Sequence, residues 1–295
     1  MEDSKQTHIG NATNFWLHSH ESGYDLSRPS SSSSPSSRLQ VATTTDQITV
    51  DPAKSALIVI DMQNFFLSPA LGRGTDGAGH KAKDQLVKHA VPGARKAGVR
   101  VLWVNWGLTE KEVNEMPPGV KKAFGFPGKY KKAHEANKSA KHYNGLGSEM
   151  GTVQDPDTGK DIEAGKLLMR DQWNSALQPP LNELWEEGSK LSKLPDVWIH
   201  KNRMSALWGS DTDLELYLHK EGITTLFFTG VNTDQCVGGT LQDAYSKGYD
   251  CILLGDGCGT TSPVYAQQCM EYNGAGTWGF LATCEKFAEG CAKVQ

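Results

Sequence analysis

One stretch, residues 226–248 together with the preceding Thr225, constrains the fold of this chain more than any other. It begins with the β-branched and aromatic run from Thr225 to Thr229, and from Gln235 to Lys247 its apolar residues recur at helical spacing. The first pattern is typical of a buried strand, and the second of a helix with one apolar face. A buried strand that passes through a short turn into a helix predicts one βα unit of an α/β protein.

Cys236 falls at the start of the predicted helix. The first turn of a helix has unpaired backbone N–H groups and the positive end of the helix dipole, which favour a thiolate and can hold an oxyanion. Cys236 therefore has the setting of a nucleophile, and we expect it to be the most reactive of the six thiols. The alternative is that it is a small buried hydrophobic residue, as many free cysteines are.

The same alternation of strands and helices continues from residue 55 to the end of the chain. It predicts a doubly wound, mainly parallel six-stranded sheet with helices on both faces and the common strand order 3-2-1-4-5-6. A helix is expected over 81–97, with a break at Pro92. The six expected strands are 56–60, 99–104, 196–200, 225–229, 250–254 and 277–283.

The chain divides into an N-terminal arm, residues 1–50, and a body, residues 51–295. The arm has little hydrophobic pattern apart from Phe15, Trp16 and Leu17, and it includes the Ser/Pro-rich linker PSSSSSPSSR. Its aromatic piece could dock on the body or on another subunit, or the whole arm could be a disordered tail. We expect the body to fold without residues 1–40.

A long insertion, residues 107–195, interrupts the body. It is too long for a simple crossover, and loops of this length are usually lids or binding loops. The lysine-rich run at 121–142 within it is most simply a solvated surface.

Composition excludes several classes of protein. A net charge of −4 argues against a dedicated nucleic-acid binder, and no apolar run approaches the ~18 residues of a membrane span. The N-terminus has no basic region leading into an apolar one, and the six cysteines are irregularly spaced without a CxxC pair. We therefore expect a cytoplasmic chain with reduced thiols.

Three chemically active residues follow three predicted strands. Asp61 comes directly after 56–60, Lys201 after 196–200, and Cys236 shortly after 225–229. In the expected strand order the carboxyl ends of these strands border one crevice, so the three side chains should lie together. A thiol nucleophile needs a base and profits from a cation, which the other two supply. Asp61 could instead cap the segment that follows it.

Three segments resemble the signature blocks of the isochorismatase-like cysteine hydrolases, which include nicotinamidases, N-carbamoylsarcosine amidases and ureidoacrylate amidohydrolases. The blocks occur in the family's order, and the resemblance extends over about residues 55–290, nearly the whole body. They are ALIVIDMQNFF, HKNRMSALWGSDTDLELYLHKEGI and FFTGVNTDQCVGGTLQDAYSKGYDCILLGDGCG.

The resemblance implies roles for particular residues. Asp61 matches the family's general base, Lys201 its lysine and Cys236 its nucleophile. The turn GVNTDQC matches the family's G-x-x-T-x-x-C, which implies a cis peptide between Val231 and Asn232. It also implies an oxyanion hole formed by the N–H groups of Asn232 and Cys236.

Two departures from relatives narrow the expected chemistry. The stretch VNWGLTEKEVNEM lacks the histidines that bind a metal in nicotinamidases, so we expect a metal-independent enzyme without a cofactor. True isochorismatases lack the cysteine nucleophile, so Cys236 favours acyl transfer. The segments 166–177 and 266–280 look closest to the ureidoacrylate amidohydrolase branch.

The expected function is hydrolysis of a carbon–nitrogen bond in a small amide, ureide or imide through a thioester. An isochorismate-type vinyl ether hydrolase and a non-catalytic interaction protein are the alternatives. The resemblance also implies a homo-oligomer, a dimer or tetramer. An aromatic wall and two amides could bind the substrate, although each could equally be ordinary packing; these candidates are Phe66, Asn105, Trp106, Trp173 and Asn174.

Overall fold

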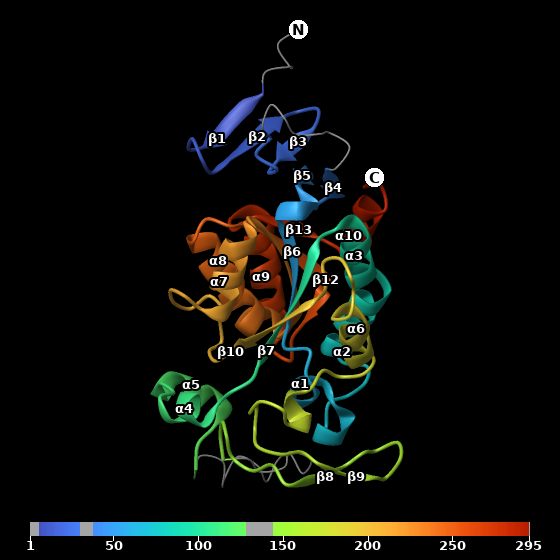
Figure 1. Ribbon diagram of the computed structural model, residues 1–295, viewed down its shortest axis with the longest axis vertical. Coiled ribbons are helices and arrows are strands. Elements are labelled where there is room, and N and C mark those ends of the chain that lie inside the picture. Colours follow the sequence, from blue (N-terminus) through green and yellow to red (C-terminus); the bar gives the residue numbers. More distant parts are fainter. Residues whose placement is uncertain (1–5, 30–37, 128–143, 295) are drawn as a thin grey trace.

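The computed structural model describes residues 6–29, 38–127 and 144–294. Nearly all of the Ser/Pro-rich linker and most of the lysine-rich run lie outside the described residues. The described chain forms a central sheet between two groups of helices, with a smaller sheet at one end and short helices and a hairpin at the other (Figure 1).

The central sheet has six strands, and every neighbouring pair runs parallel. Its spatial order corresponds to 3-2-1-4-5-6 in chain order, so the predicted fold class is confirmed. The two middle strands are apolar along almost their whole length and buried on both sides, as suits the centre of a parallel sheet. In spatial order the strands are β10 (Val197–Lys201), β7 (Arg100–Trp106), β6 (Ser55–Ile60), β11 (Thr225–Val231), β12 (Asp250–Gly259) and β13 (Phe280–Ala282).

Helices cover both faces of this sheet, and each face has its own hydrophobic core. Alternate residues of β6 point to opposite faces, so Ile58 packs in one core and Val59 in the other. Figure 1 shows the two groups on either side of the strands. One group is α7 (Asp213–Glu221), α8 (Gly238–Ser246) and α9 (Val264–Gly276), and the other is α2 (Ala78–Gln85), α3 (Val91–Ala97), α6 (Leu181–Gly188) and α10 (Cys284–Cys291).

Pro92 does not break the helix expected over 81–97. A π-helical turn, Leu86–Ala90, joins α2 to α3, and Pro92 falls within the first two residues of α3. Proline lacks an N–H and its ring crowds the preceding turn of a continuing helix, so the turn before it has to adjust. The prediction of a break was wrong because the wider π turn absorbs the proline without ending the helix.

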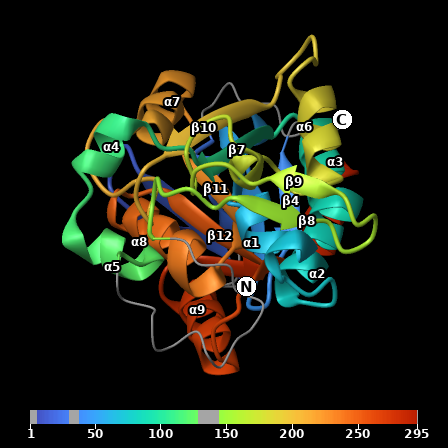
Figure 2. The same ribbon diagram turned by 90° about the horizontal axis from the view of Figure 1, so that it is seen from below.

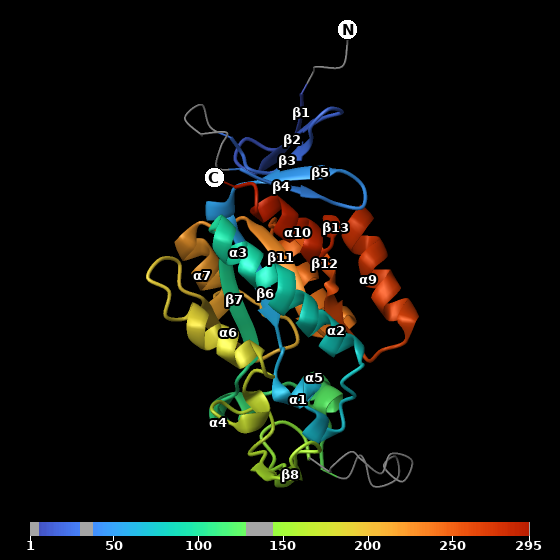
Figure 3. The same ribbon diagram turned by 90° about the vertical axis from the view of Figure 1, so that its right-hand side faces the viewer.

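The part of residues 1–50 that the structure describes is a five-stranded sheet where we expected an arm. Its strands are short, and their isolated apolar residues, such as Val41 and Ile48, are fully buried in the core that also contains α10. Figure 3 shows this sheet lying across the end of the molecule beside α10. In spatial order the strands are β1 (Thr7–Gly10), β2 (Phe15–Ser19), β3 (Gly23–Asp25), β5 (Gln47–Val50) and β4 (Leu39–Ala42).

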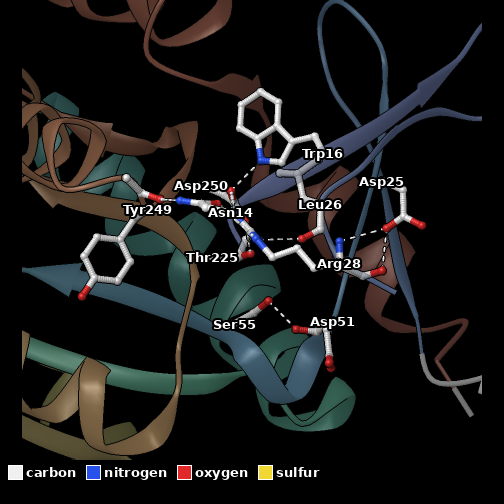
Figure 4. A network of polar contacts seen from close by, with 12 residues as sticks. Asn14, Trp16, Asp25, Leu26, Arg28, Asp51, Ser55, Thr225, Tyr249 and Asp250 are labelled. Atoms are coloured by element: carbon white, nitrogen blue, oxygen red, sulfur yellow. Dashed lines mark hydrogen bonds and ion pairs between the residues drawn. The ribbon is translucent and has the colours of Figure 1, made fainter. Parts of the chain in front are cut away.

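A polar network around Asp250 ties this small sheet to the body (Figure 4). Asp250 is the first residue of β12 and is almost completely buried. Its carboxylate accepts two hydrogen bonds from Arg28 at 2.7 Å each, one from Trp16 Nε1 at 2.6 Å and one from the Thr225 hydroxyl at 2.8 Å. The indole of Trp16 also lies 5.5 Å from the ring of Phe280, between centroids. One of the aromatic residues noted in the sequence is therefore docked on the body.

The described parts of the insertion lie over the carboxyl ends of the central strands, and Figure 2 views the molecule from this end. They include a two-stranded hairpin, short helices and, unexpectedly, α6, which packs beside the sheet as an ordinary crossover helix. The elements over the carboxyl ends of the strands are α1 (Asn64–Leu67), α4 (Glu110–Asn114), α5 (Pro118–Phe124), β8 (Thr152–Gln154) and β9 (Asp161–Glu163).

No helix among the described residues is long and apolar enough to cross a membrane.

Candidate active site

Asp61 lies immediately after β6, at the carboxyl edge of the sheet, and is fully buried. Its backbone has a φ of 53°, and its N–H donates to the carbonyl of Val104 at 3.0 Å. Oδ1 accepts a hydrogen bond from the backbone N–H of Trp106 at 3.1 Å, while Oδ2 lies 2.9 Å from Lys201 Nζ. Burial raises the pKa of this carboxyl above its ordinary value, an effect that Lys201 partly offsets.

Lys201 ends β10, and its side chain is only 2% exposed. Besides contacting Asp61, the ammonium donates to the carbonyls of Arg203 at 3.1 Å and Met204 at 3.3 Å. It also lies 4.0 Å from the centre of the Trp106 ring, which gives a cation–π contact. A buried cation is tolerated only with such partners, and here a carboxylate, two carbonyls and an aromatic face supply them.

Cys236 occupies the π-helical turn Thr233–Val237 that leads into α8, and it is 3% exposed. Its sulfur lies 3.2 Å from Met204 Sδ and within hydrogen-bonding reach of the Asp61 carboxylate. Burial and the negative charge of Asp61 raise the pKa of this thiol to about 12, and Lys201 and the Trp106 indole oppose them less strongly.

The expectation that the helix start lowers the pKa of the Cys236 thiol was therefore wrong. The helix start is present, but removal of the sulfur from water and the neighbouring carboxylate outweigh it. The raised pKa favours a thiol with a carboxylate beside it over a preformed thiolate.

The turn before Cys236 contains the cis peptide between Val231 and Asn232 that the resemblance implied. Asn232 is the N-cap residue of the π-helical turn and is partly exposed. Together with Phe66 it borders a cavity of about 170 Å³. The proposed oxyanion donors, the N–H groups of Asn232 and Cys236, thus belong to one turn beside the Asp61 carboxylate.

The five candidate substrate residues do not form one wall. Trp106 and Trp173 border a cavity of about 740 Å³, whereas Phe66 borders the smaller one. Asn105 is fully buried, and neither atom of its amide has a hydrogen-bond partner among the described residues. Asn174 is also fully buried, and its amide holds the backbone of Ala164, Lys166 and Leu168. We no longer expect Asn174 to contact a substrate, because all three of these hydrogen bonds brace the surrounding loop.

Sequence reasoning missed Gln63, which fixes the backbone beside the carboxylate. Its Nε2 donates to the carbonyls of Trp106 and Ser175, both at 2.7 Å, and its Oε1 accepts from the Trp106 N–H at 3.2 Å. Its place two residues after Asp61 in the first signature block was the available signal. Arg73, which borders the same small cavity as Asn232, lies in a glycine-rich segment that gave no signal.

Within the described part of the chain there is no group of three or more His, Cys, Asp or Glu side chains that could hold a metal ion. All six cysteines are free thiols. The site itself is a carboxylate, an ammonium and a thiol gathered in a place almost closed to solvent. Such a group can transfer a proton between sulfur and oxygen while the charge stays balanced.

The strand order and the position of these residues define the class: a doubly wound α/β protein with a thiol, a carboxylate and an ammonium at the carboxyl edge of its sheet. Residues 55–273 match the isochorismatase domain family. The chain belongs to the isochorismatase family.

Several solved structures have a similar fold. A cysteine hydrolase from Pseudomonas syringae pv. phaseolicola 1448A is 16% identical, with a TM-score of 0.58 over 83% of this chain and 96% of its own. An isochorismatase family protein from Desulfovibrio vulgaris subsp. vulgaris str. Hildenborough is 18% identical, with a TM-score of 0.53 over 81% and 98%. A nicotinamidase from Bacillus subtilis is 19% identical, with a TM-score of 0.52 over 78% and 99%. At these identities the likeness concerns the fold.

Proposed function

We propose that this protein is a cysteine hydrolase that cleaves a carbon–nitrogen bond in a small amide, ureide or imide. The observation that carries the proposal is the buried contact among Asp61, Lys201 and Cys236, in which the thiol lies beside a carboxylate paired with an ammonium at 2.9 Å. The names of two similar folds, cysteine hydrolase and nicotinamidase, agree with this chemistry.

In the first half-reaction Cys236 attacks the substrate carbonyl as its proton passes to Asp61. The carbonyl oxygen becomes an oxyanion, which the N–H groups of Asn232 and Cys236 stabilise. The carbon–nitrogen bond then breaks, and Asp61 returns the proton to the leaving nitrogen. A thioester on Cys236 and free ammonia or amine are the products of this step.

In the second half-reaction a water molecule attacks the thioester while Asp61 takes one of its protons. The carbon–sulfur bond breaks, and the sulfur recovers its proton from Asp61, which restores the resting state. The raised pKa of Asp61 helps both halves, because a carboxylate that holds a proton more tightly is a stronger base toward the thiol and the water. Lys201 keeps its positive charge throughout and offsets the charge of Asp61.

The alternatives differ in their need for sulfur. A vinyl ether hydrolase of the isochorismate type needs an acid at this place but no thiol, and an interaction protein needs neither. The position of the Cys236 sulfur against Asp61 favours acyl transfer over both. A ureide remains among the proposed substrates because the segments 166–177 and 266–280 resemble the ureidoacrylate amidohydrolases.

Replacement of Cys236 by alanine tests the proposal. We expect Cys236→Ala to abolish ammonia release from a panel of small amides and ureides, and rapid quenching of the wild type should trap an acyl adduct on Cys236. Chelators should leave the activity unchanged, since we propose a reaction without metal or cofactor. If Cys236→Ala keeps most of its turnover, the covalent mechanism fails and the ether hydrolase becomes the better reading.

We also propose that the enzyme is cytoplasmic and homo-oligomeric. Six free thiols are consistent with a reducing compartment. The oligomer rests only on the resemblance, and light scattering of the purified protein would determine its size.

A further inference from the structure

The cavity of about 170 Å³ beside Asn232 contains an arginine that has no anionic partner among the described residues. Its wall comes from the end of α1 and the segment after it, the start of α2, and the ends of β11 and β12 with the loops that follow them. The residues that matter here are Phe66, Arg73, Gly79, Asn232, Thr260 and Thr261. None of the described residues that line it is acidic.

Arg73 is the only arginine or lysine among these lining residues. Its Nε is buried but has no hydrogen-bond partner among the described residues, and none of their ion pairs includes it. The guanidinium lies over the ring of Phe65, 5.9 Å from its centre. The partly buried guanidinium thus has an aromatic ring nearby, and its Nε has no acceptor among the described residues.

The other shielded arginines show what such a group normally binds. Arg28 makes its ion pair with Asp250 at 2.7 Å, and Arg95 makes one with Asp196 at 2.6 Å. In both cases the chain supplies a buried carboxylate in the fork of the guanidinium. Arg73 is as well placed to bind a carboxylate, but the described chain supplies none.

The start of α2 adds to the positive potential of the cavity. Its N-cap is Gly77, which has no side chain to accept from the first N–H groups, and the first turn contains no acidic residue. Gly77, Ala78 and Gly79 all line the cavity. Free N–H groups at a helix start favour a bound anion, and here they supplement Arg73.

The cavity is continuous with the proposed catalytic turn, because Asn232 belongs to both. The hydroxyl of Thr260 is already engaged, since it donates to Asp234 at 2.6 Å. Arg73, supplemented by the start of α2, is therefore the group we assign to an anion at this place, and the cavity also reaches the oxyanion donor Asn232.

We propose that Arg73 binds a carboxylate of the substrate, so that the preferred substrate is an anionic amide such as the monoamide of a short dicarboxylic acid. This inference rests on the proposed function for its catalytic consequence. The planar fork of arginine matches the two oxygens of a carboxylate. A neutral amide of the same shape would leave the buried guanidinium unpaired and is disfavoured for that reason.

Matched substrates test this preference. Malonamate, succinamate and glutaramate are compared, by initial rates of ammonia release, with their neutral diamides, which have nearly the same shape. For at least one chain length the wild type should prefer the anion by about 10- to 100-fold in kcat/KM. Arg73→Met should remove this preference by raising KM for the anion, and Arg73→Lys should retain part of it.

Lys81→Met is the control for simple loss of charge, because Lys81 is exposed in the first turn of α2 and does not line the cavity. This variant should keep the wild-type preference. Equal loss of rate on anion and diamide in Arg73→Met would overturn the proposal, as would a wild type that prefers the diamide.

Binding separates this inference from the proposed function. Calorimetry with Cys236→Ala, and with Cys236→Ala combined with Arg73→Met, should show tighter binding of the anion only when Arg73 is present. If that difference is found but the wild type hydrolyses none of the compounds, the proposed function fails and the carboxylate site stands. If the wild type hydrolyses them but the two binding constants agree, the carboxylate site is refuted and the proposed function stands.

Discussion

Two buried aspartates lie at opposite edges of the same parallel sheet. Asp250, at the amino edge, accepts four hydrogen bonds, two of them from its partner Arg28. Asp61, at the carboxyl edge, accepts one from a backbone N–H, and its Oδ2 has no hydrogen bond of good geometry among the described residues, although Lys201 Nζ is 2.9 Å away. A carboxylate whose oxygens all accept hydrogen bonds stabilises the fold, whereas a carboxylate with a free acceptor position can still take up a proton.

The largest expected effect comes from exchanging each carboxylate for an amide. Asp61→Asn should lower kcat/KM by about 10³- to 10⁴-fold, because an amide cannot take the thiol proton. Asp250→Asn should leave kcat/KM per folded molecule near the wild-type value but lower the melting temperature. Steady-state kinetics and thermal unfolding of both variants check the contrast. Substantial activity in Asp61→Asn would remove Asp61 from the mechanism.

Arg28→Met tests the opposite side of the comparison. It keeps the bulk of the side chain but leaves Asp250 as a buried charge without its cation, which should cost about 3–5 kcal/mol in the free energy of unfolding. Urea unfolding measures this loss, and activity below the transition should be unchanged. A cost below about 1 kcal/mol would mean that the ion pair behaves like an exposed one.

The fold at the carboxyl edge was predictable because local patterns determine it. The strands are continuous apolar runs, and the position of Asp61, Lys201 and Cys236 at or shortly after three strand ends was enough to bring them together. The resemblance also anticipated the cis peptide at Val231–Asn232.

The N-terminal sheet was not predictable in the same way. Its strands have three to five residues, and its anchor joins Trp16 to a residue 234 positions away. Leu26 and Leu39 are fully buried in a core shared with the body. We therefore no longer expect the body to fold normally without residues 1–40.

Residue type alone also did not predict the roles of individual side chains at the site. Asn105 and Asn174 look equivalent in the sequence. The amide of Asn105 has no hydrogen-bond partner among the described residues, whereas the amide of Asn174 makes three hydrogen bonds to the backbone. The direction of the Cys236 pKa was missed because a helix start is visible in the sequence and the extent of desolvation is not.

The reactivity of the thiols should reflect this burial. Cys269 is exposed and should react first with iodoacetamide without loss of activity, which replaces our expectation that Cys236 reacts first. With a pKa of about 12, Cys236 becomes more ionised as pH rises, so its alkylation should accelerate about tenfold per pH unit from pH 7 to 10 without a plateau.

Peptide mapping in a Cys269→Ser background measures this dependence. A plateau below pH 8 in the wild type would indicate a preformed thiolate.

The smallest expected effects compare two tryptophans, one beside each aspartate. Trp16→Phe removes the N–H that donates to Asp250 at 2.6 Å but keeps an aromatic ring near Phe280. Asp250 retains three other donors, so the loss should be about 1–2 kcal/mol in the free energy of unfolding.

The Nε1 of Trp106 has no hydrogen-bond partner of good geometry among the described residues and faces the Cys236 sulfur. Trp106→Phe should therefore change stability less than Trp16→Phe does, while it lowers kcat. Urea unfolding and steady-state kinetics of both variants measure these effects. A larger loss of stability in Trp106→Phe would contradict the view that the amino edge of the sheet stabilises the fold while the carboxyl edge carries the chemistry.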